Sequence, residues 1–112
     1  KIGSWQIGMT GSTAIKFSSK QSIGESDSDD LSLNKNSWHH IVLTKSSSKI
    51  IKIYTNNSLS ETIQLNDWSI EWLRVGTNRN TANFWKGNID DIRVYDYVLS
   101  TENINTLYQI YK

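Results

Sequence analysis

Two adjacent carboxylates, Asp90 and Asp91, lie in the stretch of sequence with the strongest β-strand pattern. Ile92 and Val94 alternate with polar side chains, as residues of a strand with one buried face do. The same phase, carried back two residues, places Asp90 among the buried side chains, where an unpaired polar group costs roughly 2–7 kcal/mol. We therefore expect Asp90 to accept hydrogen bonds, to bind a cation, or to be moved out of phase by a bulge near Gly87.

Paired carboxylates can hydrolyse glycosidic bonds, but they must then face each other across a cleft, about 5–10 Å apart. Neighbouring residues of a strand point to opposite faces of the sheet, so Asp90 and Asp91 do not flank one bond. The sequence also lacks a Ser-His-Asp arrangement, a phosphate-binding glycine loop and a zinc-ligand spacing. We expect that the protein is not an enzyme.

Two further clusters contain groups that bind metals elsewhere. The acidic run from Glu25 to Asp30 offers the oxygen ligands that Ca²⁺ prefers, although a solvated loop is the simpler interpretation of such a run. His39 and His40 are neighbours on an expected strand, so they face opposite sides and cannot chelate one ion together. We expect both histidines to be structural.

The tryptophans offer a different chemistry. We expect Trp38 and Trp85 to be structural, whereas Trp72 lies opposite the buried phase of its strand and Trp68 lies in a connection. An exposed indole stacks on the apolar face of a sugar ring, and arginine or asparagine bonds its hydroxyls. The predicted ligand-binding residues are therefore Trp68, Trp72, Arg79, Asn80 and Asn83. The alternative is that the two tryptophans cover a second apolar layer or an interface.

Composition limits the partners. The 112 residues include 12 basic and 11 acidic side chains, so the net charge of +1 indicates neither nucleic-acid nor membrane-surface binding. No apolar run approaches the roughly 20 residues of a membrane-spanning helix, and we expect no membrane insertion. Cysteine is absent. We expect one domain, residues 1–112, which is a fragment of a longer protein.

Most of the chain alternates with the period of a strand. We predict two strands within residues 1–20 and a polar loop over 18–30. Further strands are predicted over 38–44 (central in its sheet), 49–55, 59–65, 73–76 and 84–95. Asn56-Asn57 tolerates positive φ and predicts a hairpin, and Leu59, Ile63 and Leu65 should then share one face.

The period changes at the end of the chain. Ser100 is suited to cap a helix, and Glu102 lies in its first turn, where the helix dipole favours a negative charge. An apolar stripe follows at helical spacing and should pack on the outside of a sheet: Ile104, Leu107, Tyr108 and Tyr111.

The order of these segments resembles the laminin-G-like, concanavalin A-like jelly-roll family. The resemblance rests on Trp38-His39-His40-Ile41-Val42, Ile53-Tyr54 with its tight turn, Leu73-Arg74-Val75-Gly76, Trp85 to Tyr95, and Leu99 to Ile104. It covers residues 38–108 and implies an all-β, antiparallel jelly-roll sandwich with one short C-terminal helix. The segment before Trp38 is shorter than the family expects, so the opening strands look missing; either the sandwich is trimmed, or an oligomer partner or another chain segment completes it.

The resemblance also implies a ligand and a location. Because many relatives carry one structural Ca²⁺, we expect such an ion with Asp90 as a ligand. We predict a non-catalytic module that binds carbohydrate on an extracellular, cell-surface or virion-surface protein. The main alternative is a structural or adhesion domain that binds protein, for example in a virus or phage particle; a fragment of a glycan-active enzyme ranks third. The fold prediction requires two layers to close over six side chains: Ile41, Leu43, Ile53, Val75, Ile92 and Val94.

Overall fold

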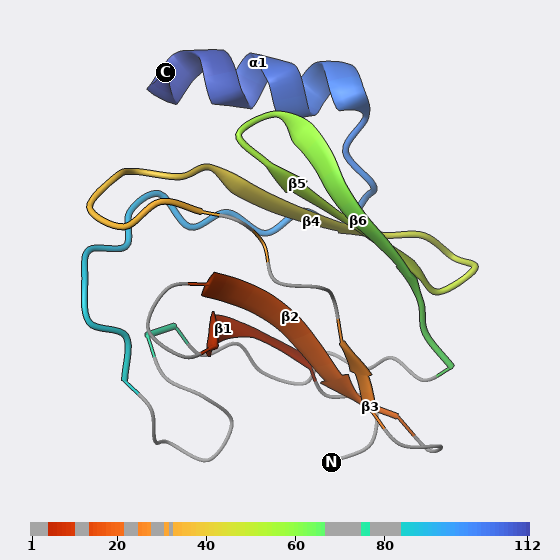
Figure 1. The fold of residues 1–112 in the computed structure, drawn as a ribbon. Coiled ribbons are helices and arrows are strands. Elements are labelled where there is room, and N and C mark those ends of the chain that lie inside the picture. Colours follow the sequence, from red (N-terminus) through yellow and green to blue (C-terminus); the bar gives the residue numbers. More distant parts are fainter. Residues whose placement is uncertain are drawn as a thin grey trace.

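The computed structural model describes residues 5–10, 14–21, 25–27, 31, 33–66, 75–76 and 84–112. Within these residues, six strands form two antiparallel sheets of three strands each, and one helix follows them (Figure 1). The sheets are stacked, and the helix lies on the outer side of the second sheet. The predicted all-β architecture with a single C-terminal helix is confirmed.

The first sheet has the order β1-β2-β3, with β1 at Trp5–Thr10, β2 at Ala14–Lys20 and β3 at Glu25–Asp27. The two strands predicted within residues 1–20 are confirmed. The prediction of a polar loop over 18–30 is wrong at residues 18–20 and 25–27, because β2 extends to Lys20 and β3 pairs with it. Backbone hydrogen bonds define these pairs, and they do not require apolar side chains.

The second sheet has the order β4-β5-β6, with β4 at Ile41–Lys45, β5 at Ile50–Thr55 and β6 at Ser58–Gln64. Asn56 and Asn57 join β5 to β6 with φ angles of 49° and 68°, which is the left-handed conformation that a two-residue hairpin needs. The predicted hairpin is confirmed.

Two details of this sheet differ from the prediction. Within the described strands β5 is central, and β4 lies beside β5 alone. The apolar character of β4 therefore results from one buried face and not from pairing on both sides. A register shift in β6 also places Leu59 opposite Tyr54 and Glu61 opposite Ile53. The intervening Ser60 is an extra residue that reverses the phase, so Leu59 does not share a face with Ile63.

An apolar core fills the space between the two sheets. Trp85 packs against its edge as a half-buried side chain, as predicted, and its amide donates to the Gly76 carbonyl at 2.7 Å. A side chain at Gly87 would place a Cβ 3.0 Å from the Trp85 indole nitrogen, a close contact that glycine avoids. The buried members of this core are Phe17, Leu31, Ile51, Ile53, Ile63 and Leu65.

The helix α1, at Thr101–Tyr111, covers part of the outer face of the second sheet (Figure 1). Ser100 caps it by accepting a hydrogen bond from the Asn103 amide at 3.1 Å. Ile104 is completely buried in a second apolar cluster with Tyr54 and Leu99. The predicted cap and the predicted packing of the apolar stripe are confirmed. In the described part of the chain, no helix is long and apolar enough to cross a membrane.

The predicted strand over 84–95 is wrong. The structure has no strand within 84–112, and Ile92 and Val94 are 54% and 74% exposed. Asp91 has a φ of +51°, which interrupts an extended chain and ends the alternation on which the prediction rested.

Of the six predicted core side chains, three therefore belong to the core and three do not. Ile53 is fully buried, and Ile41 and Leu43 pack against the core as partly buried residues. Ile92, Val94 and Val75, which is 48% exposed, do not belong to it. Trp38 is 68% exposed, so its predicted structural role is also wrong; it precedes β4 and is not held in that strand's alternation.

Candidate functional site

The predicted ligand-binding residues lie outside the part of the chain that the structure describes. This holds for Trp68, Trp72, Arg79, Asn80 and Asn83. Their grouping into a sugar-binding surface stays a prediction. Among the residues singled out for chemistry, the structure places Asp90, Asp91, His39 and His40, together with Glu25 and Asp27 of the acidic run.

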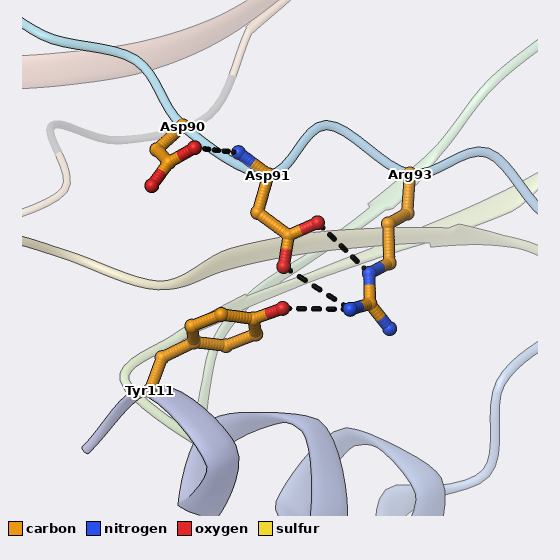
Figure 2. Close-up of polar contacts among 4 residues, drawn as sticks. All are labelled: Asp90, Asp91, Arg93 and Tyr111. Atoms are coloured by element: carbon orange, nitrogen blue, oxygen red, sulfur yellow. Dashed lines mark hydrogen bonds and ion pairs between the residues drawn. The ribbon is translucent and has the colours of Figure 1, made fainter.

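Asp90 is an exposed residue, not a buried one. Its carboxylate accepts a hydrogen bond from the Asp91 amide at 2.8 Å, as Figure 2 shows. Of the three alternatives for this residue, the hydrogen-bonded one agrees with the structure. The expected conflict between a carboxylate and a buried position does not arise, because the positive φ of Asp91 takes Asp90 out of the strand phase.

Asp91 forms an ion pair with Arg93 and joins the chain to the last turn of α1. Its two carboxylate oxygens accept from Arg93 Nε at 3.0 Å and Arg93 Nη2 at 3.2 Å, and Nη2 also donates to the Tyr111 hydroxyl at 2.6 Å (Figure 2). The hydrogen bond to Asp91 raises the pKa of Arg93 further above its ordinary value. Asp91 is thus engaged by a permanent cation and has a positioning role for α1.

The two histidines have different surroundings, as predicted. His39 bonds the Asn34 carbonyl oxygen at 2.7 Å through Nε2 and Asn56 at 3.1 Å through Nδ1. His40 packs against two rings of α1, with centroid distances of 5.9 Å to Tyr108 and 6.5 Å to Tyr111.

Partial burial of His40 affects its protonation. Burial lowers the pKa of His40, and the negative charge of Asp91 opposes that effect. The Nδ1 atom of His40 is buried, and no group in the described ranges forms a hydrogen bond with it. These contacts support a structural role for this histidine in seating the helix.

Among the described residues, no three acidic or histidine side chains come together as metal ligands. Glu25 and Asp27 lie in β3, and the rest of the acidic run lies outside the described residues. The calcium ion therefore stays a prediction.

A hollow that the sequence did not predict lies between the outer face of the second sheet and the segment that leads into α1. Its volume is about 330 Å³. Strand residues form the floor, and the chain around the start of α1 forms the wall. The lining residues are Thr44, Ser46, Ile50, Lys52, Tyr54, Val98, Leu99, Ser100 and Thr101.

The chemistry of this hollow suits binding. Its polar groups are hydroxyls and one ammonium group, and no carboxylate lines it, so the acid and base pair of a glycosidase is absent from its described lining. Because side chains alternate along a strand, Lys52 and Tyr54 share the face of β5 opposite Ile51 and Ile53. No sequence signal could show that residues 98–101 approach that face.

With this geometry described, the class of protein follows. The chain belongs to the concanavalin A-like lectin/glucanases superfamily, whose family model matches residues 1–105. The match confirms the resemblance and extends it to the first residue.

A solved structure is similar to the chain. It is the 2.1 Å crystal structure of residues 221–444 of an S-layer domain-containing protein from Clostridium thermocellum ATCC 27405. The two share 26% sequence identity with a TM-score of 0.57, over 84% of this chain and 51% of that one. The chain thus spans about half the length of that structure. No curated protein matches the chain.

Proposed function

We propose that this domain is a non-catalytic recognition module that binds carbohydrate on a cell-surface or extracellular protein. The superfamily contains both lectins and glucanases, so fold alone does not choose between binding and hydrolysis. The similar structure comes from an S-layer domain-containing protein, which supports a surface location.

The engagement of Asp90 and Asp91, the two carboxylates singled out from the sequence, carries the non-catalytic part of this proposal. Asp91 is held by Arg93, and Asp90 accepts from a backbone amide. A glycosidase needs one carboxyl group to protonate the leaving oxygen and a second to attack or to activate water. A carboxylate with both oxygens on a guanidinium is poorly suited to either step.

The carbohydrate part rests on the predicted loop residues. Trp68 and Trp72 would stack on sugar rings, and Arg79, Asn80 and Asn83 would bond the hydroxyls. Such a surface is shallow and recognises a sugar by one aromatic face and a few hydrogen bonds.

Tryptophan fluorescence titration against a panel of oligosaccharides tests this proposal. We expect saturable quenching in the unaltered protein and its loss in Trp72→Ala. Trp38→Ala is the matched control, because Trp38 is an exposed indole outside the predicted site, and quenching should persist in it. Circular dichroism establishes that both variants fold. Quenching that survives Trp72→Ala, or no response to any oligosaccharide, would contradict the proposal.

A structural calcium ion near Asp90 forms part of the same proposal. The exposed Asp90 carboxylate has one oxygen on the Asp91 amide, and its other oxygen could ligate Ca²⁺. We expect a chelator to lower the melting temperature, and Asp90→Asn to reduce that effect. An unchanged melting temperature in the unaltered protein would remove the ion from the account.

A second function, protein binding in an adhesive or structural assembly, is favoured by one observation. Large apolar side chains are exposed along residues 84–98, namely Phe84, Ile89, Ile92, Val94 and Val98. Surfaces of this kind often mark protein interfaces. Sedimentation equilibrium tests it: an oligomer that Val94→Lys dissociates supports the second function, and a monomer at all concentrations opposes self-association.

A further inference from the structure

The floor of the hollow is one face of two paired strands. Thr44 of β4 lies directly opposite Lys52 of β5, and paired residues project to the same side of a sheet. Ile50 and Tyr54 lie two residues to either side of Lys52, so they share its face. The chain from Val98 to Thr101 crosses beside this face on its way into α1 and closes the hollow on one side.

Two hydroxyl groups in the floor have no hydrogen-bond partner among the described residues. Thr44 and Tyr54 are each only 8% exposed, and neither hydroxyl is hydrogen-bonded by any group in the described ranges. Neither oxygen is among the fully enclosed, unpartnered polar atoms of the described residues, and both side chains line the hollow. A polar ligand that enters it can therefore bond both hydroxyls.

The described lining of the hollow carries charge of one sign. Lys52 is the only charged residue in that lining, and it forms no ion pair with the described residues. The first turn of α1 adds partial positive charge from its backbone amides. Glu102 lies in that turn but does not line the hollow. A ligand seated here therefore meets an ammonium group and hydroxyls, and the described lining holds no carboxylate to repel an anion.

We propose that this hollow binds a sugar residue that carries a carboxylate, with Lys52 on the carboxylate and the hydroxyls of Thr44 and Tyr54 on the ring. The sugar hydroxyls would bond these two hydroxyls, and Leu99 and Ile50 offer an apolar surface to the carbon face of the ring. A volume of about 330 Å³ lies within the range of small-ligand sites. The inference rests on the proposed carbohydrate binding but concerns a site separate from the tryptophan loop.

A matched pair of ligands tests the inference. Methyl β-glucuronide and methyl β-glucoside differ only in the carboxylate at the sixth carbon, and both are titrated into the protein while backbone amide resonances are followed by NMR. We expect the glucuronide to shift the amides of Thr44, Lys52 and Thr101. The glucoside should bind the same place about tenfold more weakly, because it loses a charge-assisted hydrogen bond.

Variants assign the effect to named groups. Lys52→Met keeps the side-chain stem and should weaken glucuronide binding about tenfold while leaving glucoside binding unchanged. Lys35→Met is the control, because Lys35 is an exposed lysine in the turn before β4 and does not line the hollow. Tyr54→Phe keeps the ring and should weaken both glycosides.

The outcomes separate this inference from the broader proposal. If oligosaccharides quench tryptophan fluorescence but neither glycoside shifts the hollow amides, carbohydrate binding stands and the inference is overturned. If acetate shifts the amides as strongly as the glucuronide, the hollow binds small anions and not sugars, which also overturns it. Equal glucuronide affinity in the unaltered protein and Lys52→Met would remove the assigned role of Lys52.

Discussion

The two faces of the β4-β5-β6 sheet have different roles, although the same strands form both. On the inner face Ile51 and Ile53 are completely buried against the first sheet. On the outer face Tyr54 lies under α1, while Thr44 and Lys52 line a hollow beside the start of that helix. Because a strand alternates its side chains, one sequence can seal a core on one side and present polar groups on the other.

The inner face should contribute most to stability, and Ile53→Ala tests this. The substitution removes a fully buried side chain from the inter-sheet core, so the free energy of unfolding should fall by about 3 kcal/mol in urea denaturation. Ile92→Ala is the matched control, because Ile92 is exposed, and it should change that free energy by less than about 0.5 kcal/mol. Equal losses from the two variants would contradict the assignment of the core.

The outer face should contribute less, because α1 covers only part of it. Ile104→Ala removes the one helix residue that is completely buried, and we expect a loss of about 2 kcal/mol. Ile110→Ala in the same helix should be nearly neutral, since Ile110 is exposed. Thermal unfolding followed by circular dichroism compares the two variants, and an Ile104→Ala loss larger than that of Ile53→Ala would reverse the ranking of the faces.

The helix cap should have a smaller effect. Ser100 accepts from the Asn103 amide, and Asn103 bonds back to the Ser100 amide, so the first turn has a reciprocal cap. Ser100→Ala should lower the free energy of unfolding by about 1 kcal/mol. The adjacent Thr101→Ala should not, because Ser100 provides the cap. A similar loss in both variants would argue against it.

Acidification should lower the free energy of unfolding by weakening the packing of α1, and this effect should be smaller than those of the three substitutions above. Burial lowers the pKa of His40, so the unfolded chain takes up a proton at higher pH than the folded protein does. The stabilisation is complete above the ordinary histidine pKa of about 6.5 and is lost as pH falls through the lowered value. We expect unfolding measurements between pH 7.5 and pH 5 to show this decline, and His40→Phe to flatten it; the same slope in both proteins would exclude His40 as its source.

Local sequence signals predicted the parts of the fold that local chemistry decides. The Asn56-Asn57 turn, the alternation of β5 and the cap at Ser100 each act within a few residues, and the structure agrees with all three. Leu59 and Ile92 were misplaced for a shared reason. One extra residue in β6 and one positive φ at Asp91 change the alternation of side chains. Neither position is a glycine or a proline, so the sequence does not mark it.

For the candidate sites, too, the local chemistry was predictable from the sequence and the long-range surroundings were not. The chemistry of Asp90 and the histidines was predictable as residue types, but their surroundings depended on backbone conformation and on the position of α1. The hollow above β5 arises where residues 98–101 meet a sheet face encoded about fifty residues earlier, and such a long-range contact leaves no periodic signal. The predicted sugar-binding tryptophans lie outside the described residues and stay a prediction.

Calorimetric titration of an oligosaccharide, followed by mass spectrometry of the recovered ligand, directly measures binding without turnover. We expect saturable heat and an oligosaccharide recovered at its original mass after prolonged incubation. Shortened products would show that the domain hydrolyses its ligand, and no heat with any member of a broad oligosaccharide panel would show that it does not recognise carbohydrate.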